Sequence, residues 1–255
     1  MKVHDNIDQQ SAEWFNLRKN KVTGSKLPKL ISCKSFEKLS GKVYDQEIGS
    51  IAIGEWVRDD GGGIGTQAME EGHIGEGEAD RLYNKIRTEE WEERHELKEK
   101  VLDVEYGEDR SNLARPYIEK EKIIITNHAF LESDCGRYGY SPDGVVSDGG
   151  FIEIKTIFNQ GKFLQAMISE AQNLLIDDKY LMQIMMGFVI SPKFKYCDFI
   201  VYSMYMPSEC NLKIFRINRS DYEEKINQVK EILESEILPE IELVRQNFKK
   251  QFNLI

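Results

Sequence analysis

The spacing of apolar residues changes along the chain between a helical period and a strand period, which predicts a mixed α/β (α+β) protein. In the helical segments apolar positions recur every three or four residues, as in the stripe Tyr222, Ile226, Val229 and Leu233. In the strand segments they alternate or form short runs. The expected helices cover residues 8–40, 66–100, 163–177, 180–190 and the chain after Ser220; the expected strands cover residues 123–125, 129–131, 145–146, 151–157, 197–206 and 212–217. We therefore expect a mixed central sheet flanked by helices.

Turn and cap signals place the ends of several elements. Pro28 lies near an expected helix start, Ser220 to Glu223 has the pattern of a capping box, and Pro239 predicts a kink in the last helix. Residues 59–65 are rich in glycine and predict a flexible loop within residues 41–65. This loop lacks the Gly-Lys-Ser/Thr ending of a phosphate-binding loop, so the sequence does not indicate nucleotide hydrolysis. Without repeats or a long linker, residues 1–255 are expected to form one domain.

A tight β-hairpin carries the most informative chemistry. Val145-Val146 forms the first arm, residues 147–150 form the turn, and residues 151–157 form the returning arm. Because successive side chains of a strand point to opposite faces, Glu153 and Lys155 share one face of this arm. Asp143 precedes the first arm, so the hairpin is expected to bring together two carboxylates and one ammonium group.

Two carboxylates beside a lysine suit a divalent metal and a water that attacks phosphate. Mg²⁺ prefers hard oxygen ligands and is usually held by one or two carboxylates plus substrate phosphate. Such a metal lowers the pKa of bound water and screens the charge of the phosphodiester, while a nearby lysine can stabilise the transition state. Asp143, Glu153 and Lys155 match the Asp…Glu-x-Lys pattern of Mg²⁺-dependent nucleases. Taken alone, the motif fits a surface hairpin with a solvated Glu153–Lys155 ion pair better than an active site, because short motifs often match by chance.

Three further blocks extend this pattern along the chain. Glu13-Trp14 leads to Arg18 and Val22-Thr23-Gly24-Ser25, Gly72 precedes Glu76 in the segment that ends at Tyr83, and Gln183 follows Tyr180 in an apolar run. Together with the hairpin, and in this order, the blocks resemble the phage lambda exonuclease family. These are viral-type recombination exonucleases of the PD-(D/E)xK nuclease superfamily. The resemblance implies a restriction-endonuclease-like core.

The resemblance also implies roles for individual residues. Asp143, Glu153 and the main-chain carbonyl of Ile154 match the ligands of a first metal ion, and Glu76 with Asp143 matches a second site. Two ions, Mg²⁺ or Mn²⁺, are implied. Lys155 matches the catalytic lysine.

A second set of residues matches a pocket for the 5′-terminal phosphate of the DNA substrate. The set consists of Arg18, Ser25, Ser141 and Gln183. A guanidinium, two hydroxyls and a carboxamide are suitable donors for a phosphate dianion.

Each of these residues also has a purely structural interpretation. Glu76 lies near Glu70, Glu71 and Glu78 and fits a solvated acidic helix face. Gln183, between Met182 and Ile184, fits a hydrogen-bonded core residue. Arg18 fits a solvent-exposed member of a basic run, and Ser25 fits a cap for a helix that begins near Lys26.

The net charge of −10 is the main objection to a DNA-binding protein. Its distribution weakens this objection. Residues 18–42 contain eight basic residues and one acidic residue, Glu37, whereas residues 87–109 contain ten acidic and four basic residues. A basic block beside the expected phosphate pocket suits the DNA backbone. The alternative is that residues 19–42 form a solvated amphipathic helix.

Composition fits a globular protein, with 40% hydrophobic and 31% charged residues. The four cysteines are scattered without a Cys-x-x-Cys pair, so we expect reduced thiols and no iron–sulfur cluster. The four histidines are too dispersed to indicate a zinc site. No signal peptide or membrane span is apparent, which favours a cytoplasmic protein. A phage or prophage origin is implied by the resemblance to the phage lambda exonuclease family.

The residues alone argue for two-metal phosphodiester hydrolysis. The resemblance implies more: a Mg²⁺-dependent 5′-to-3′ exonuclease that degrades one strand of linear double-stranded DNA and leaves a 3′ overhang. It also implies a ring-shaped homotrimer and a single-strand annealing partner. Departures near residues 41–65 and 87–119 are expected to be insertions. The alternatives are a structure-specific or restriction-type endonuclease on the same fold and a non-catalytic DNA-binding protein.

Overall fold

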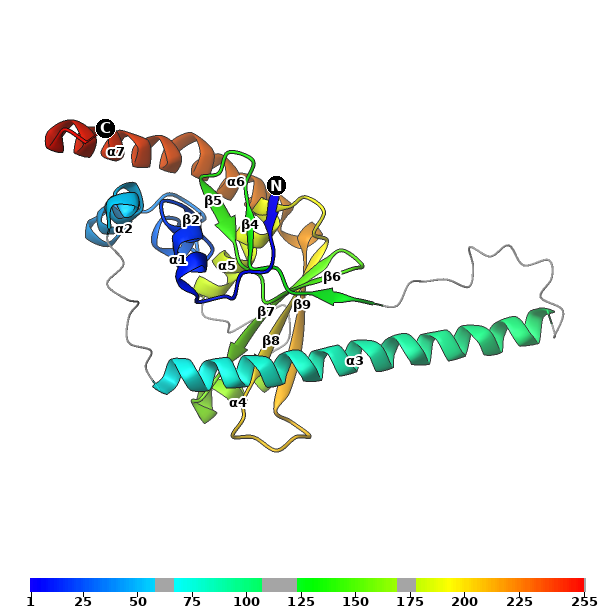
Figure 1. Cartoon of the computed structure of the whole chain (residues 1–255). Coiled ribbons are helices and arrows are strands. Elements are labelled where there is room, and N and C mark those ends of the chain that lie inside the picture. The colour runs from blue at the N-terminus through cyan, green and yellow to red at the C-terminus, as the bar shows by residue number, and fades with distance from the viewer. Residues whose placement is uncertain (58–66, 107–122, 169–177, 255) are drawn as a thin grey trace.

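Two β-sheets and a set of flanking helices make up the protein (Figure 1). The computed structural model describes residues 1–57, 67–106, 123–168 and 178–254. The glycine-rich loop predicted at residues 59–65, residues 107–119 of the second expected insertion, and residues 169–177 of an expected helix lie outside this description.

The larger sheet has five strands in the order β3-β6-β7-β8-β9. The strands are β3 (Ile125–Thr126), β6 (Gly144–Val146), β7 (Gly150–Thr156), β8 (Tyr196–Tyr202) and β9 (Leu212–Asn218). β7 and β8 are parallel, and the other neighbours are antiparallel. The predicted mixed sheet is therefore confirmed, and so is the hairpin, in which β6 and β7 pair with Val145 opposite Phe151.

A second sheet of four strands, in the order β1-β4-β5-β2, was not expected from the sequence. It contains β1 (Lys2–His4), β4 (Phe130–Glu132), β5 (Tyr138–Tyr140) and β2 (Val22–Thr23). Only β4 falls within a predicted strand. β2 is two residues long and lies inside the helix predicted for residues 8–40, so that prediction is wrong over most of its length. The helical part is limited to α1 (Ala12–Arg18) and a 3₁₀ turn, η1 (Leu27–Lys29), which contains Pro28 as expected.

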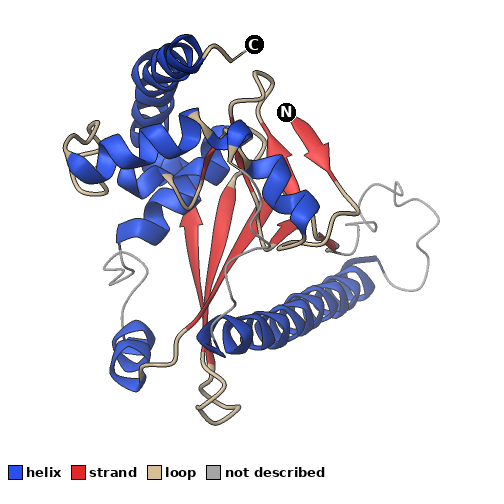
Figure 2. Ribbon diagram, turned by 60° about the vertical axis from the view of Figure 1, so that its left-hand side comes forward, coloured by secondary structure: helices blue, strands red, loops and turns tan. Residues whose placement is uncertain are grey.

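Helices cover both faces of the larger sheet. The 40-residue helix α3 (Gln67–Tyr106) runs along one face, and its C-terminal part extends beyond the strands (Figure 1). On the other side lie α5 (Asp178–Ile190) and the C-terminal helices, so that the sheet stands between them and α3 (Figure 2). The remaining elements are α2 (Lys42–Ala52), η2 (Gly54–Trp56), α4 (Gln160–Ile168), η5 (Arg219–Tyr222), α6 (Glu223–Ile232), η6 (Leu233–Ile237) and α7 (Leu238–Phe252).

Strand alternation divides the core into two apolar layers. Phe151 and Phe199 face α5 and belong to the larger cluster. Ile152, Ile154 and Ile200 face α3 and pack in a smaller cluster with Ala79 and Tyr83. This two-sided burial follows from the side-chain period of two and fixes which face of β7 carries Glu153 and Lys155.

Residues 42–52, for which no element was predicted, form α2, with Tyr44, Ile48 and Ile51 buried at helical spacing. Two predictions near the last helices need correction. The capping box at Ser220 is absent, because residues 219–222 form a 3₁₀ turn and α6 begins without a side-chain cap. Near Pro239, where a kink was expected, the helical run passes through the π-helical turn η6 before α7. Among the described helices none is long and apolar enough to span a membrane.

A buried polar network fastens α3 to the larger sheet. The Tyr83 hydroxyl donates to Asp198 Oδ2 at 2.5 Å, and Arg216 donates to both oxygens of the same carboxylate at 2.7 and 2.8 Å. One turn further along α3, Arg87 donates to Asp148 at 2.8 Å. Breaking such buried, paired charges is costly, so the network holds α3 in a fixed position on the sheet.

Gly75 lets the backbone of α3 approach Thr156 of β7 closely, nearer the N-terminal end of the helix than Tyr83 and Arg87. A Cβ atom built on Gly75 would lie 2.5 Å from Thr156 Oγ1 and 2.6 Å from Thr156 Cγ2, distances that real Cβ atoms do not adopt. The backbone of α3 therefore lies directly against the end of β7. Glu76, the next residue, is placed beside the hairpin by this contact.

Candidate active site

The hairpin places the three predicted residues of the Asp…Glu-x-Lys pattern together. Asp143 lies just before β6, and its Oδ2 atom accepts a hydrogen bond from the Ile154 N–H at 2.6 Å. Its own N–H donates to the carbonyl of Ile152 at 3.2 Å. These two bonds fix Asp143 beside the middle of β7, next to Glu153. Ile154 was expected to offer its carbonyl to a metal, and its N–H already orients one of the expected carboxylate ligands.

Glu153 is held from two sides. Its side chain is nearly inaccessible, at 6% exposure, and its Oε1 atom lies 2.7 Å from Lys155 Nζ. Its Oε2 atom accepts a short hydrogen bond from the Tyr140 hydroxyl. The alternative interpretation of a solvated ion pair on a surface hairpin is therefore wrong, because Glu153 is buried and Lys155 is only 21% exposed.

Burial dominates the electrostatics of this group. Burial raises the pKa of Asp143 to about 8; the charges of Glu153 and Glu76 add to the shift, while Lys155 and the Ile154 N–H oppose it. Burial would lower the pKa of Lys155, but the charges of Glu153 and Asp143 outweigh it and hold that pKa above its ordinary value. Lys155 thus remains an ammonium group. Once Asp143 is ionised, two carboxylates face one lysine, and a divalent cation would offset this surplus of negative charge.

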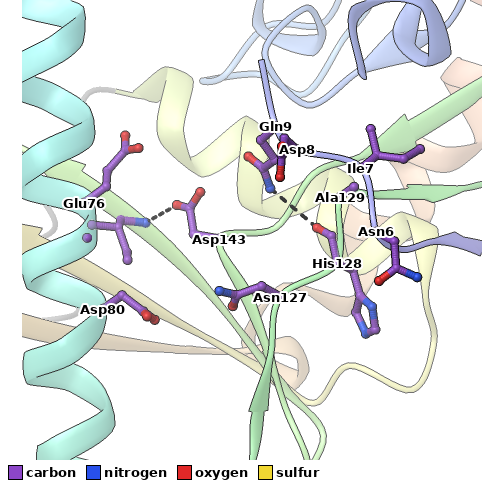
Figure 3. Close-up of a pocket in the computed structure, with 12 residues that line it drawn as sticks. Asn6, Ile7, Asp8, Gln9, Glu76, Asp80, Asn127, His128, Ala129 and Asp143 are labelled. Atoms are coloured by element: carbon purple, nitrogen blue, oxygen red, sulfur yellow. Dashed lines mark hydrogen bonds between the residues drawn. The ribbon is translucent and has the colours of Figure 1, made fainter. Parts of the chain in front are cut away.

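Glu76 reaches the same place from α3. It lines a cavity of about 530 Å³ together with Asp143 and Ile154 (Figure 3). The rest of the wall comes from the N-terminal segment, the approach to β4, and the next turns of α3: Asn6, Ile7, Asp8, Gln9, Gly77, Asp80, Asn127, His128 and Ala129. In Figure 3 Glu76 and Asp80 project from α3 toward Asp143 and Asn127. The structural alternative for Glu76, an outer solvated helix face, does not describe this position.

The donors present fit a divalent cation in chemistry. Asp143, Glu153, Glu76 and the Ile154 carbonyl are hard oxygen ligands of the kind that Mg²⁺ and Mn²⁺ select. Across residues 1–57, 67–106, 123–168 and 178–254, no three His, Cys, Asp or Glu side chains are close enough together to hold a metal ion.

The expected phosphate pocket is largely assembled beside these carboxylates. Arg18, at the end of α1, donates to Ser141 Oγ at 3.1 Å and to Ser25 Oγ at 3.2 Å. The Ser25 hydroxyl also lies 3.2 Å from that of Thr23. Ser25 does not cap a helix, since η1 begins without a side-chain cap. Two hydroxyls from distant parts of the chain therefore converge on one guanidinium.

The guanidinium group of Arg18 stacks on the indole ring of Trp14. The guanidinium carbon lies 3.9 Å from the centroid of the indole ring, and the indole N–H donates to Ser141 Oγ at 3.2 Å and to the Ala129 carbonyl at 3.0 Å. Burial lowers the pKa of Arg18 to about 10, against the charge of Glu153, which raises it. Arg18 is thus a desolvated cation with a preset orientation, not a surface residue of a basic run.

Gln183 is the fourth expected pocket residue and lies on α5. Its Oε1 atom is buried and has no hydrogen-bond partner within the described residues. Its helix contacts the pocket loop, because a Cβ on Gly24 would lie 3.6 Å from the Gln183 carbonyl oxygen. The interpretation of Gln183 as a satisfied core residue is therefore wrong. Rotation of this amide group about its last side-chain bond would present its NH₂ to an anion.

The basic block of residues 18–42 is not a helix beyond Arg18, so the amphipathic-helix alternative is wrong. Several of its lysines are already paired. Lys29 lies 2.8 Å from Glu47, Lys38 lies 2.7 Å from Glu240, and Lys21 lies 3.5 Å from Glu132. Much of the positive charge in this block therefore stabilises the packing of α2, α7 and the second sheet. All four cysteines are free thiols, as expected.

Sequence reasoning missed three contributors to the site. They are Tyr140, which binds Glu153; Gly75, which sets the distance of α3; and Asp80, one turn beyond Glu76 on the cavity wall. Asp80 could have been found from its i+4 spacing to Glu76. Tyr140 and Gly75 act through tertiary contacts that no local pattern encodes.

Comparisons with solved structures identify the fold. The chain is similar to an alkaline exonuclease from Laribacter hongkongensis, with 20% identity, 94% of this chain and 100% of that chain covered, and a TM-score of 0.60. The structure of the same exonuclease in complex with dAMP gives 21% identity, the same coverage and a TM-score of 0.61. The two chains share one fold. The expected mixed α/β fold, with a mixed central sheet flanked by helices, is confirmed.

Other comparisons add little. A phage-related exonuclease from Haemophilus somnus 129PT is 14% identical over 93% of this chain and 98% of that chain, with a TM-score of only 0.47. No protein-family model and no curated protein matches the sequence. At 20% and 21% sequence identity, the likeness to the Laribacter hongkongensis exonuclease shows a shared fold. The function has to be argued from the residues of the candidate site.

Proposed function

We propose that this protein is a metal-dependent DNA exonuclease that starts at a 5′-phosphorylated duplex end and leaves a 3′ single-stranded overhang. One observation carries the proposal: Ser141, which accepts a hydrogen bond from Arg18, is only two residues before Asp143, which adjoins Glu153 and Lys155. A candidate phosphate pocket and a candidate metal site thus share one short segment. The fold of an alkaline exonuclease, whose structure includes a dAMP complex, supports the same reading.

The length of that segment suits removal of nucleotides from an end. Ser141 precedes a proline, which favours an extended backbone, and two extended residues span about 6.6 Å. This is comparable to the separation of successive phosphates along one DNA strand. A terminal phosphate bound by Arg18, Ser25 and Ser141 therefore places the following phosphodiester near Asp143. Gln183 completes this pocket from α5.

Each residue of the metal site has a defined task in this proposal. Asp143, Glu153 and the Ile154 carbonyl would hold one divalent cation, Mg²⁺ or Mn²⁺, and Glu76 with Asp143 would hold a second. The bound cation would supply an activated water and offset charge on the phosphodiester. Lys155 stays protonated beside Glu153 and donates hydrogen bonds to the reacting phosphate oxygens as negative charge develops on them.

The assembly and partners belong to the same proposal. Its substrate is the end of double-stranded DNA in the cytoplasm of a bacterial host. Its oligomer is a ring-shaped homotrimer that cooperates with a single-strand annealing protein in recombination. Light scattering at working concentration tests the trimer directly, and a monomer mass with full activity would reject it.

Digestion of linear and covalently closed circular duplex DNA with Mg²⁺ tests the activity. We expect the linear form alone to be degraded, with 5′-mononucleotides released and a 3′-terminated strand left. The Asp143→Asn variant, which removes a negative ligand without changing side-chain volume, should fold and bind DNA but lose hydrolysis by several orders of magnitude. Cleavage of both forms would instead identify an endonuclease, and cleavage of neither would identify a DNA-binding protein.

A further inference from the structure

Tyr140 occupies the boundary between the metal site and the phosphate pocket. It is the last residue of β5, immediately before Ser141, and is only 3% exposed. Its hydroxyl donates to Oε2 of Glu153, whose other oxygen pairs with Lys155 at 2.7 Å. Each carboxylate oxygen accepts about two hydrogen bonds or ligands, so one partner per oxygen leaves room for a cation.

The ring of Tyr140 cannot swing away from this position. It packs edge-on against Phe151, with ring centroids 5.6 Å apart and an interplanar angle of 80°. Two glycines enclose its other sides: a Cβ on Gly24 would lie 3.0 Å from Tyr140 Cδ2, and a Cβ on Gly187 would lie 3.1 Å from Tyr140 Cε1. Gly24 adjoins Ser25, and Gly187 lies one turn beyond Gln183 on α5. The hydroxyl is thus fixed by the same elements that form the phosphate pocket.

Tyr138 provides an internal comparison. It lies two residues earlier on β5, is buried at 6% exposure, and its hydroxyl donates to Glu234 at 2.7 Å. Both tyrosine side chains are therefore buried and donate to a glutamate, but Glu234 is exposed on η6 and lies outside the site, whereas Glu153 is buried. The substitutions Tyr140→Phe and Tyr138→Phe each delete one hydroxyl oxygen and remove one hydrogen-bond donor from a glutamate. A difference in metal binding between the two variants therefore reports the specific effect on Glu153.

We propose that Tyr140 is a positioning residue that fixes the carboxylate of Glu153 for a divalent cation. The inference rests on the proposed metal-dependent function. A glutamate side chain has several rotatable bonds, and a ligand in one preset orientation binds without losing that freedom. Hydrogen-bond partners behind metal ligands commonly contribute a factor of about 10–100 to metal affinity or activity.

The test compares Tyr140→Phe with Tyr138→Phe in the full-length protein. Mn²⁺ binding is measured without DNA by isothermal titration calorimetry. The melting temperature with and without Mn²⁺ provides a second measurement of ion binding that works even for a destabilised variant. Steady-state hydrolysis of 5′-phosphorylated duplex is then followed as a function of Mn²⁺ and of DNA concentration.

We expect Tyr140→Phe to weaken Mn²⁺ binding about tenfold or more. Its kcat should recover toward the wild-type value as Mn²⁺ is raised, while KM for DNA ends stays unchanged. Tyr138→Phe should bind Mn²⁺ as the wild type does, whatever its melting temperature. Equal Mn²⁺ affinity for Tyr140→Phe and the wild type, or equal losses in both variants, would overturn the inference. Wild-type protein without Mn²⁺-dependent hydrolysis would instead refute the proposed function itself.

Discussion

The ammonium nitrogen of Lys155 lies 2.7 Å from Oε1 of Glu153, two residues before it on β7. The alternation of the strand puts both side chains on the face opposite Ile152 and Ile154, which pack against α3. Lys155 therefore lies beside Glu153 on the face of β7 that points away from α3. The side chains of Ile154 and Thr156, its neighbours on β7, point to the other face and cannot take its role.

The first prediction concerns this lysine. Lys155→Ala should reduce hydrolysis by several orders of magnitude, because it removes the donor that stabilises charge on the phosphate. Mn²⁺ binding, measured by calorimetry, should persist or strengthen, since the variant removes a positive charge beside the ligands. Lys195→Ala is the matched control: Lys195 donates to the Asp148 carbonyl at 3.4 Å, at the far end of the sheet, and its loss should leave activity unchanged. Wild-type activity in Lys155→Ala would remove Lys155 from the mechanism.

A second prediction follows from the pKa of Asp143, which burial raises from 3.8 to about 8. Between these values the unfolded chain has lost the proton while the folded protein keeps it. The folded state thus binds more protons, and the contribution of Asp143 to stability falls as pH rises through this window. The metal-free wild type should have a lower free energy of unfolding at pH 9 than at pH 6. Asp143→Asn should flatten this dependence.

Divalent ions compete with that proton. Carboxylates must be ionised to bind a metal, so activity should rise with pH up to about 8 at low Mg²⁺. Raising Mg²⁺ should move the acid limb of the activity profile to lower pH. An acid limb that does not respond to Mg²⁺ would mean that another group controls the profile.

The third prediction concerns the contact between α3 and β7. Gly75→Ala inserts a methyl group within 2.6 Å of two Thr156 side-chain atoms, and such overpacking costs roughly 1–3 kcal/mol. It should also displace Glu76 and lower activity. Gly77, on the same helix, has open space where its Cβ would lie, so Gly77→Ala should stabilise the protein by about 0.5–1 kcal/mol. Urea unfolding measures both effects.

Thr156→Ala supplies the compensating change. It removes the two nearest atoms and leaves only the Thr156 Cβ atom, at 3.1 Å from the added methyl group. The double variant should regain most of the stability lost in Gly75→Ala, so the two changes should be non-additive. Additive losses would show that the close approach of α3 does not depend on Gly75.

The hairpin was predictable because its signals are local. The turn residues, the alternation of Phe151 to Lys155 and the acidic residue before β6 lie within one short stretch, and the structure reproduces that register. Three strands of the second sheet were missed: β1, β2 and β5, which contain only three, two and three residues. For β1 and β2 the reason lies in their partners. They are strands because they pair with β4 and β5, more than 100 residues away, and no local period reveals such pairing.

The composition of the site was only partly predictable for the same reason. Asp143 was identified from the hairpin motif, and Arg18, Ser25 and Ser141 from the resemblance to the phage lambda exonuclease family. The structure brings these residues together. The contacts that orient them come from tertiary packing: the Trp14 ring under Arg18 and the Tyr140 hydroxyl on Glu153. The basic block illustrates the opposite error, because pattern alone cannot show that Lys29 and Lys38 are already paired with carboxylates.

The last prediction separates a 5′-end exonuclease from other nucleases on this fold. If Arg18 binds the terminal phosphate, the wild type should prefer 5′-phosphorylated over 5′-hydroxyl duplex ends. Truncating one partner of a buried, hydrogen-bonded charge pair costs about 2–5 kcal/mol. Arg18→Ala should therefore slow phosphorylated ends far more than hydroxyl ends and remove most of the preference, while Mn²⁺ binding persists. Competition between the two substrates in one reaction measures the ratio directly.

Lys34→Ala is the control for general attraction to DNA. Lys34 is an exposed member of the same basic block, so its loss should weaken both substrates equally and reduce the salt dependence of binding slightly. Arg18 is buried over Trp14 and bonded to two serine hydroxyls, a geometry that recognises a group of defined shape more than a uniform backbone. If Arg18→Ala instead behaves like Lys34→Ala, with equal effects on both ends, the pocket has no role in reading the 5′ phosphate. The nuclease chemistry of Asp143, Glu153 and Lys155 would stand, but its direction would have to come from elsewhere in the chain.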